Sequence, residues 1–326
     1  MKSLITKRQL LFVILVLLCG INPIYADTSK KLYVNCGNLS DLLPERERFK
    51  ITDLTLSGQL DIRDLEVIRQ MGGCRESYES RYNGHLRYLD LSNAEFVSGG
   101  TFGTYADDYF RTSDLNDGSG DYLFSDMKSL HTIKLPNSME IMGQYLFVGC
   151  ESLTSVTLPK SLKTLPDWTF SSCKSLTSVT IPSGVKYISS FTFRDCESLR
   201  FINLPSDLKY IGEEAFEGCT GLTSIYAFME KPCEIDETTF ENETIINATL
   251  YVPKGSLLDY WDDNQWKKFM NIEEFDVTSI GSLNTNVNDV QEVSRYSDNG
   301  QRLNTPAKGL NIVKYNNGTV KKIMVK

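Results

Sequence analysis

Histidine is nearly absent from this chain, which has only His85 and His131 among its 326 residues. A histidine-based catalytic triad or a multi-histidine metal site has almost nothing from which to be built. Neither histidine lies in a recognisable motif, and His131 falls within a repeat strand, so we interpret both as structural. The Gly-x-Ser-x-Gly, P-loop and dinucleotide-binding fingerprints are also missing. We therefore expect no catalysis, no metal and no cofactor.

Basic residues are outnumbered, with 34 Lys and Arg against 42 Asp and Glu. An acidic chain without a basic stripe is a poor partner for nucleic acid or for an anionic membrane. The many carboxylates leave one enzymatic alternative open, a glycoside hydrolase that uses a pair of them. One sequence does not reveal how such carboxylates are spaced in the fold.

Long apolar runs are missing after the first 26 residues. Lys2, Lys7 and Arg8 precede the apolar run 10–18, and a small residue stands at Ala26. This pattern is typical of a secretory signal peptide, so we expect the mature chain to be exported, to the cell surface or the extracellular space, without a transmembrane segment. Lipidation of Cys19 is the alternative reading.

What the chain does contain is a repeat of 23 residues. One cysteine recurs in each repeat, and an earlier coil in the same register has Met127 at that position. A fixed period of this size predicts stacked coils rather than one globular core. The recurring positions are cysteine (Cys150, Cys173, Cys196, Cys219), leucine (Leu153, Leu176, Leu199, Leu222) and phenylalanine (Phe147, Phe170, Phe193, Phe216).

The cysteines of the repeat are best interpreted as buried thiols, because each fills the same inward site and the earlier coil accepts methionine there. Disulfides between coils stay possible in an oxidising compartment, since neighbouring coils are ~5 Å apart. Cys36 and Cys74 lie outside the repeat and could pair with each other. Cys233 would then be left without a partner.

Within each coil the pattern Leu-x-x-Val-x-Leu alternates between inward and outward positions. Stacking predicts a parallel sheet of seven or eight continuous strands on one face of a curved solenoid. Aromatic residues on that face favour a contact surface, although small hydroxyl residues also suit parallel strands for structural reasons. Asp53 and Thr55 begin the outward positions, and the candidate ligand-binding face consists of Tyr88, Asp90, Thr132, Lys134, Ser155, Thr157, Ser178, Thr180, Phe201, Asn203, Ser224 and Tyr226.

The two ends of the repeat read as caps. Asp61 and Gly72 bracket an amphipathic helix, and Ser256 is placed to begin a short helix through Trp261. We expect the stack to end at the strand 249–253. A Gly, Asp, Ser and Tyr-rich insertion at 94–123 contains Asp114, Asn116, Asp117 and Asp121, which we interpret as a solvated loop because the EF-hand spacing fails.

These patterns together predict a mostly β, α/β-type repeat solenoid with short helical caps and a small C-terminal β module. Strands near Tyr296, at 310–313 and at 320–325 are joined by Asn299-Gly300 and Asn317-Gly318, both hairpin signals. The predicted divisions are a signal peptide at 1–26, an N-terminal cap with irregular repeats and the insertion at 27–123, regular repeats at 124–226, a C-terminal cap at 227–275, a linker at 276–291 and a basic β tail at 292–326.

Two segments resemble known families. The motif Cys150-Glu-Ser-Leu-Thr-Ser-Val-Thr-Leu-Pro159, repeated at 173–182, resembles the BspA-type leucine-rich repeats of bacterial surface proteins over roughly residues 30–275. The segments 298–302, 308–313 and 321–326 look like the C-terminal sorting tail of type IX secretion cargo from Bacteroidetes-type bacteria, although this tail is shorter than the full domains of that family. The resemblance implies a secreted or surface protein, often an adhesin, with no catalytic residues to carry over.

We therefore predict an adhesin-like protein that binds a host or microbial surface protein or glycan through the strand-bearing face. A continuous sheet offers a rigid surface, so binding carries a small ordering cost. We expect a monomer. The alternative is a structural envelope protein without a specific ligand, because such a protein also needs only a stable stack.

Overall fold

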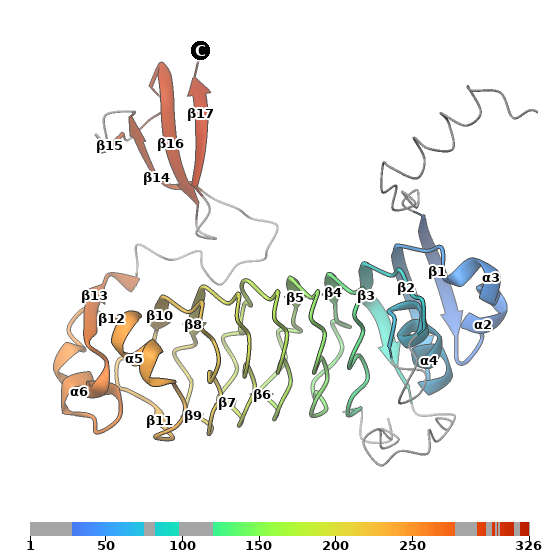
Figure 1. Ribbon diagram of the computed structural model, residues 1–326, viewed down its shortest axis with the longest axis horizontal. Helices are drawn as coiled ribbons and strands as arrows, with labels where there is room; N and C mark the ends of the chain where they lie inside the picture. Colours follow the sequence, from blue (N-terminus) through green and yellow to red (C-terminus); the bar gives the residue numbers. More distant parts are fainter. Residues whose placement is uncertain are drawn as a thin grey trace, which may run out of the picture.

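The computed structural model describes most of the chain as a row of coils followed by a small β module (Figure 1). The signal-peptide segment, the calcium-like positions 114, 116 and 117, and both hairpin dipeptides lie outside the described residues. The described residues are 28–74, 82–97, 120–277, 292–297, 302–303, 305, 307–315 and 320–325.

Most of the described coils pass through a short strand on one face of the solenoid, and several coils add a second strand on another side. All pairings in these sheets are parallel, as stacked coils require. The first face sheet contains β1 (Ser29–Asn35), β2 (Asp53–Leu60), β3 (Tyr88–Phe96), β4 (Thr132–Lys134) and β5 (Ser155–Thr157). The second face sheet contains β8 (Phe201–Leu204), β10 (Ser224–Ala227), β12 (Thr249–Pro253) and β13 (Asn271–Phe275). The side sheet contains β6 (Thr164–Leu165), β7 (Tyr187–Ile188), β9 (Tyr210–Ile211) and β11 (Glu234–Ile235).

The strand face is interrupted, so the prediction of one continuous sheet is wrong. The coil that carries Ser178 and Thr180 has no strand at these positions, and the face sheets end at β5 and begin again at β8. The inward residues of this coil are nevertheless buried, with Val179 at 5% and Ile181 at 2% exposure. Packing of the core therefore holds the coil in line where the strand ladder is missing.

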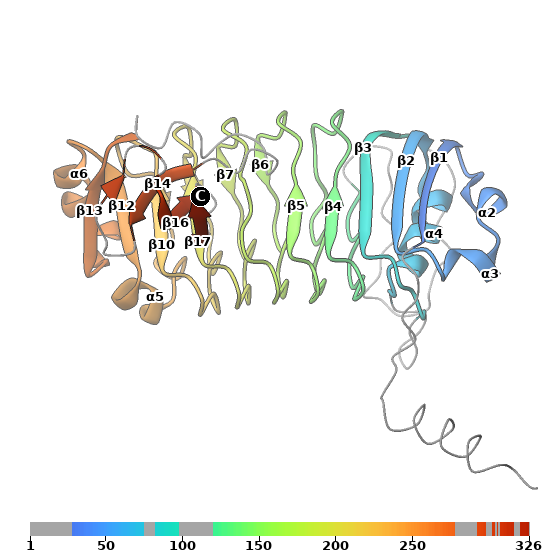
Figure 2. The same cartoon turned by 90° about the horizontal axis from the view of Figure 1, so that it is seen from above.

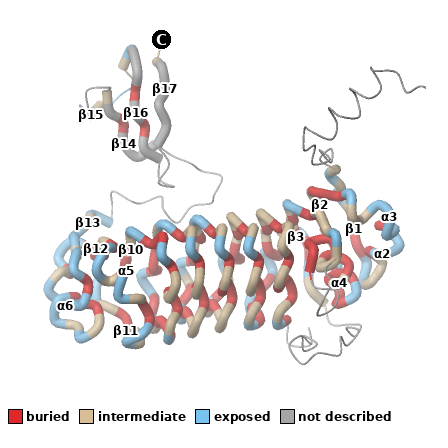
Figure 3. The backbone as a smooth tube through the Cα atoms, in the orientation of Figure 1, coloured by how far each residue is buried: buried red, intermediate tan, exposed pale blue. Residues whose placement is uncertain are grey.

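A column of stacked phenylalanines runs through the core, as the repeat predicted. Successive ring centroids are 5.0 to 5.6 Å apart, and Phe147, Phe170 and Phe193 are fully buried. Figure 3 shows buried residues recurring on the inner side of every coil. Burial of one large apolar side chain contributes roughly 1.5–3 kcal/mol, and no single coil could enclose its own ring. The column consists of Phe124, Phe147, Phe170, Phe193, Phe216 and Phe240.

The four repeat cysteines are buried thiols, which confirms that interpretation. Each thiol donates a hydrogen bond to a carbonyl of the preceding coil, for example Cys150 to Phe124 at 2.9 Å and Cys219 to Phe193 at 3.1 Å. Cys36 is an exposed thiol and forms no disulfide with Cys74. Its sulfur lies 3.7 Å from the side-chain oxygen of Gln59.

In the N-terminal part, α4 (Ile62–Met71) forms where a helix was predicted and packs its apolar residues into the core. The helix follows β2, and β1 is the outermost strand of the first face sheet. Asp61 caps α4 and Asp64 completes the capping box. Asp64 is fully buried and also accepts hydrogen bonds from the amides of Gly37 (2.6 Å) and Leu39 (2.9 Å). One carboxylate thus joins α4 to the start of the short helix α2 (Leu39–Leu42), which α3 (Glu45–Arg48) follows.

At the C-terminal end, the stack does not stop at β12, because β13 adds a further strand. Between them lie α6 (Leu257–Asp262) and η2 (Trp266–Lys268), while α5 (Asn242–Asn247) precedes β12. Trp266 and Phe269 are buried as expected, and the Trp266 indole donates to the Cys233 carbonyl at 2.8 Å. Ser256 precedes α6 as predicted, but its side chain makes no capping hydrogen bond.

The C-terminal module is an antiparallel sheet. It contains β14 (Glu292–Ser297), β15 (Arg302–Leu303), β16 (Gly309–Tyr315) and β17 (Val320–Val325). Strands were predicted at the positions of β14, β16 and β17, and β15 is an additional one. Its interior is partly polar, because Asn311 is buried and accepts a hydrogen bond from Arg295 at 3.0 Å.

Candidate binding face

The predicted binding face consists of two columns of outward positions on the face strands, and Figure 2 shows these strands from above. We call the residues Tyr88, Thr132, Ser155, Ser178, Phe201 and Ser224 the first column, and Asp90, Lys134, Thr157, Thr180, Asn203 and Tyr226 the second column. Strand register places Asp90 opposite Lys134 and Lys134 opposite Thr157, and beyond the interruption Asn203 opposite Tyr226. All of these residues are half-buried except Asn203.

Near the N-terminal end the face is polar and internally paired around Asp90. Its carboxylate accepts hydrogen bonds from the Tyr88 hydroxyl (3.1 Å), the Lys134 ammonium (3.0 Å) and the Ser92 hydroxyl (2.6 Å). Partial burial raises the pKa of Asp90, but the bonds from Ser92, Lys134 and Tyr88 outweigh it and lower the pKa to about 2. Hydrogen bonds with Tyr88 and Asp90 raise the pKa of Lys134. This end therefore presents a fixed ion pair rather than a group ready to exchange protons.

Near the C-terminal end the face becomes aromatic, and more so than the sequence had indicated. Tyr226 stacks on Tyr251 of the next coil with ring centroids 4.6 Å apart. Phe275 meets Tyr226 edge-on at 5.8 Å and Phe228 at 5.3 Å. Sequence reasoning missed Tyr251 and Phe275 because it treated their strands as a cap or did not recognise them. Extending the second column by one strand would have found Tyr251, which lies opposite Tyr226.

Asn203 is buried rather than exposed, which corrects its predicted place on the open face. It is 8% exposed, and its side-chain oxygen has no hydrogen-bond partner among the described residues. The residue lies between the interrupted coil and the ring of Tyr226. The outward position alone did not predict this burial.

Sequence reasoning also missed a row of stacked aromatic rings elsewhere on the solenoid. We call it the outer aromatic ladder, and it consists of Tyr122, Tyr145, Trp168 and Phe191. Neighbouring centroids are 4.2 to 5.9 Å apart, and Arg194 lies over Trp168 and Phe191 at 5.8 and 5.7 Å. All four residues have φ of 58–59°, a left-handed conformation that bulky side chains rarely adopt. The ladder lies in the turns that precede the buried phenylalanines, away from the two columns.

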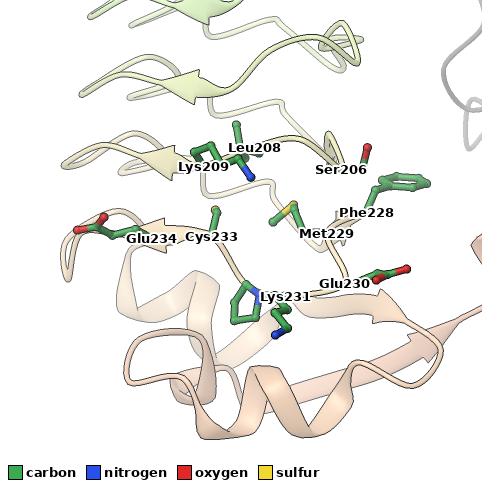
Figure 4. A pocket seen from close by; sticks show the side chains of 10 residues that line it. Ser206, Leu208, Lys209, Phe228, Met229, Glu230, Lys231, Cys233 and Glu234 are labelled. Carbon is green, nitrogen blue, oxygen red and sulfur yellow. The ribbon is translucent and has the colours of Figure 1, made fainter.

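A hollow of about 480 Å³ opens between the coil at 206–209 and the turn at 228–234 (Figure 4). Lys209 and Lys231 line it together with Glu230 and Glu234, so its charge is mixed. Burial raises the pKa of the Cys233 thiol in its wall to about 12. The thiol is therefore protonated at neutral pH and is a poor nucleophile.

Both histidines of the chain lie against backbone carbonyls. Nδ1 of His85 lies 3.0 Å from the Phe49 carbonyl, and Nδ1 of His131 lies 2.7 Å from the Ser129 carbonyl. Asp121 of the insertion accepts a hydrogen bond from the Gln144 amide at 2.8 Å. Across the described ranges, no group of three or more His, Cys, Asp or Glu side chains is placed to hold a metal ion. No helix in the described part of the chain is long and apolar enough to cross a bilayer.

Comparison with known proteins supports the repeat architecture. Residues 119–247 match the family described as BspA type leucine rich repeat region, in six copies. No curated protein matches the chain.

Several solved structures are similar to parts of the chain. A Treponema pallidum leucine-rich repeat protein (TpLRR) is 31% identical over 35% of this chain and 55% of its own, with a TM-score of 0.32. A leucine-rich cell surface protein from Faecalibacterium prausnitzii is 20% identical over 55% of this chain and 52% of its own, with a TM-score of 0.34. A leucine-rich repeat protein from Bacteroides ovatus is 18% identical over 69% of this chain and 61% of its own, with a TM-score of 0.38.

The matches therefore span only about half to three fifths of the length of these proteins. Together with the 23-residue register and the stacked parallel strands, the family match defines the fold. The chain is a repeat solenoid, and its coils at 119–247 match the BspA type leucine rich repeat region.

Proposed function

We propose that this chain is an exported, non-catalytic repeat protein that binds a protein or glycan partner through its strand-bearing face, in the manner of an adhesin. The aromatic end of that face, formed by Tyr226, Tyr251, Phe228 and Phe275, is the principal contact region. Tyrosine is enriched at binding surfaces because it combines a large apolar ring with a hydroxyl that hydrogen-bonds.

The observation that carries this proposal is the aromatic cluster at the C-terminal end of the face, where Tyr226 stacks on Tyr251 and meets Phe275 edge-on. Both tyrosines are half-buried, so part of each ring is open to a partner. Such rings on a rigid sheet offer apolar contact area together with hydroxyl groups, without a large ordering cost.

The rigidity of the face supports binding as well. Core packing and parallel pairing fix the second column from β8 to β12, so a partner would meet side chains that are already ordered. The same geometry offers little to an enzyme. Asp90 is held ionised by three side chains, and the two histidines contact backbone carbonyls.

The test is binding of the chain from Asp27 to Lys326 to matrix-protein and glycan arrays. We expect the double variant Tyr226→Ala/Tyr251→Ala to lose binding by tenfold or more, since truncating an interface anchor costs about 2 kcal/mol or more. Tyr145→Ala removes an aromatic ring from the outer aromatic ladder and is the matched control. Unchanged binding in the double variant would refute the face, and no binding by any array member would favour a structural protein.

For the basic tail we propose a role in sorting to the cell surface, on the strength of the sequence resemblance. Secretion of the full chain should be compared with secretion of a chain that ends at residue 291. Equal export of the two would refute this role without affecting the binding face.

A further inference from the structure

We propose that the two ends of the solenoid bind each other between copies of the chain, so that β13 of one molecule pairs with β1 of the next. Three features of the described residues support this head-to-tail contact: unpaired strand edges, exposed apolar side chains and opposite charge. The proposal departs from the monomer expected from sequence. It shares Phe275 of β13 with the aromatic end of the binding face, and the central strands of that face stay open in such a row.

The N-terminal edge belongs to β1, the outermost described strand of its sheet. The Thr28 carbonyl and the Cys36 amide bond to β2, so backbone groups of the alternate residues Ser29, Lys31 and Tyr33 point to the open edge. The Asn38 side chain closes only the last position, by accepting from the Asn35 amide at 3.1 Å. Most of this edge is therefore available to another strand.

The C-terminal edge belongs to β13, the outermost described strand at the other end. The Phe275 carbonyl accepts from Lys254 next to β12, so the alternate residues Ile272 and Glu274 direct their backbone groups away. All strands of the two face sheets run parallel, and β1 of a second copy would continue that direction. If the register of the stack continues, the residues of β13 whose backbone groups point outward alternate with those of β1. Parallel pairing between two strands requires this alternation.

The ends also carry most of the exposed large apolar side chains of the described residues. Repeat proteins usually close their stacks with polar outer faces, and a cluster of exposed apolar groups is typical of an interaction surface. Only Ile141 and Tyr187 of this set lie between the ends. The others are Tyr33 (65% exposed) and Leu42 (40%) at the N-terminal end, and Ile246 (55%), Leu258 (69%), Trp261 (52%), Met270 (73%) and Val277 (37%) at the C-terminal end.

Charge distinguishes head-to-tail pairing from pairing of like ends. β1 contains Lys30 and Lys31 and no acid, whereas β13 contains Glu273 and Glu274 and no base. Continuing the register places Glu273 opposite Lys31 of the next copy, and Phe275 opposite its Tyr33. Two β1 edges or two β13 edges would repel each other, so opposite ends are the favoured pair. Because such a contact is heterologous and does not close on itself, it generates an open row.

The test is sedimentation velocity of the chain from Asp27 to Lys326, over micromolar to submillimolar concentrations. We expect self-association that weakens as salt is added, because the paired charges are solvent-accessible. Lys31→Glu and Glu273→Lys should each weaken it at least about tenfold, and the double variant Lys31→Glu/Glu273→Lys should restore it. Lys174→Glu changes an exposed lysine of a central coil by the same charge and is the matched control.

A chain that stays monomeric at every concentration would overturn the proposal. So would association that neither single reversal weakens, or that the double variant fails to restore. If deletion of residues 278–326 abolishes association while the reversals have no effect, the contact belongs to the tail rather than to the solenoid ends.

Discussion

The thiol of Cys173 donates a hydrogen bond to the carbonyl of Phe147, at 3.2 Å between sulfur and oxygen. The acceptor lies 26 residues earlier, in the preceding coil, and the same bond recurs at the three other repeat cysteines. Cysteine thus fills a small apolar site and satisfies a buried carbonyl. Each of these thiols therefore bonds one coil to the next at the spacing of the repeat.

Replacing Cys173 with alanine should lower the free energy of unfolding by about 1–3 kcal/mol, because the Phe147 carbonyl loses its donor and a small cavity forms. Cys173→Ser keeps a donor at the same place and should cost less. Denaturant unfolding of both variants checks this. Equal losses would mean that volume alone matters at this site.

The buried thiols also predict destabilisation at high pH. Burial raises the pKa of Cys150 from 9.0 to about 12, and it raises the pKa of Cys173 and Cys196 as well. At pH values between 9.0 and about 12, the unfolded chain releases thiol protons that the folded chain retains. The free energy of unfolding therefore falls as pH rises above about 9. Each such thiol contributes a slope of about 1.4 kcal/mol per pH unit.

Unfolding free energies measured from pH 8 to pH 11 should show this decline, and it should be shallower in Cys196→Ala. An alkaline slope that is identical in the variant would contradict the assignment to the thiols.

Sequence periodicity predicted the core well because burial in a solenoid repeats with the chain. Phe170 and Cys173 occupy the same inward sites as their counterparts one coil away, so their positions followed from spacing alone. The left-handed backbone of Trp168 also recurs from coil to coil, but a pattern of apolar letters does not encode φ angles. The burial of Asn203, which lies opposite Tyr226, depends on neighbours that differ from coil to coil.

The end of the stack was misjudged for a related reason. β13 reads Asn-Ile-Glu-Glu-Phe, which lacks the Leu-x-x-Val-x-Leu pattern, and α6 and η2 separate it from β12. Pairing with β12 supplies the strand conformation that local sequence does not strongly favour. An edge strand buries little, so its sequence is less constrained than that of an inner coil.

Each turn of the outer aromatic ladder has a second left-handed residue, four positions after the aromatic one. This second position offers a stabilising substitution. Ser172 has φ of 59°, while the equivalent residues one coil before and two coils after are Gly149 and Gly218, with φ of 73° and 69°. Ser172→Gly should raise the free energy of unfolding by about 0.5–1 kcal/mol, because relief of the left-handed strain exceeds the entropy cost of glycine. Ser175→Gly, where φ is not left-handed, is the control and should lower stability. Thermal unfolding distinguishes them, and a lower melting temperature for Ser172→Gly would refute the strain argument.

The polar end of the binding face should make folding sensitive to acid. The pKa of Asp90 is lowered from 3.8 to about 2, so its ionised form stabilises the fold above pH 3.8 and this contribution disappears as pH falls toward 2. Asp90→Asn removes charge-assisted hydrogen bonds with Lys134 and Ser92 and should cost about 1–2 kcal/mol at pH 7. The difference between the original chain and the variant should shrink between pH 4 and pH 2, where the carboxylate is protonated. Asp207→Asn, at an exposed position, should track the original chain throughout. A gap between Asp90→Asn and the original chain that stays constant with pH would show that Asp90 stabilises the face by shape and not by its charge.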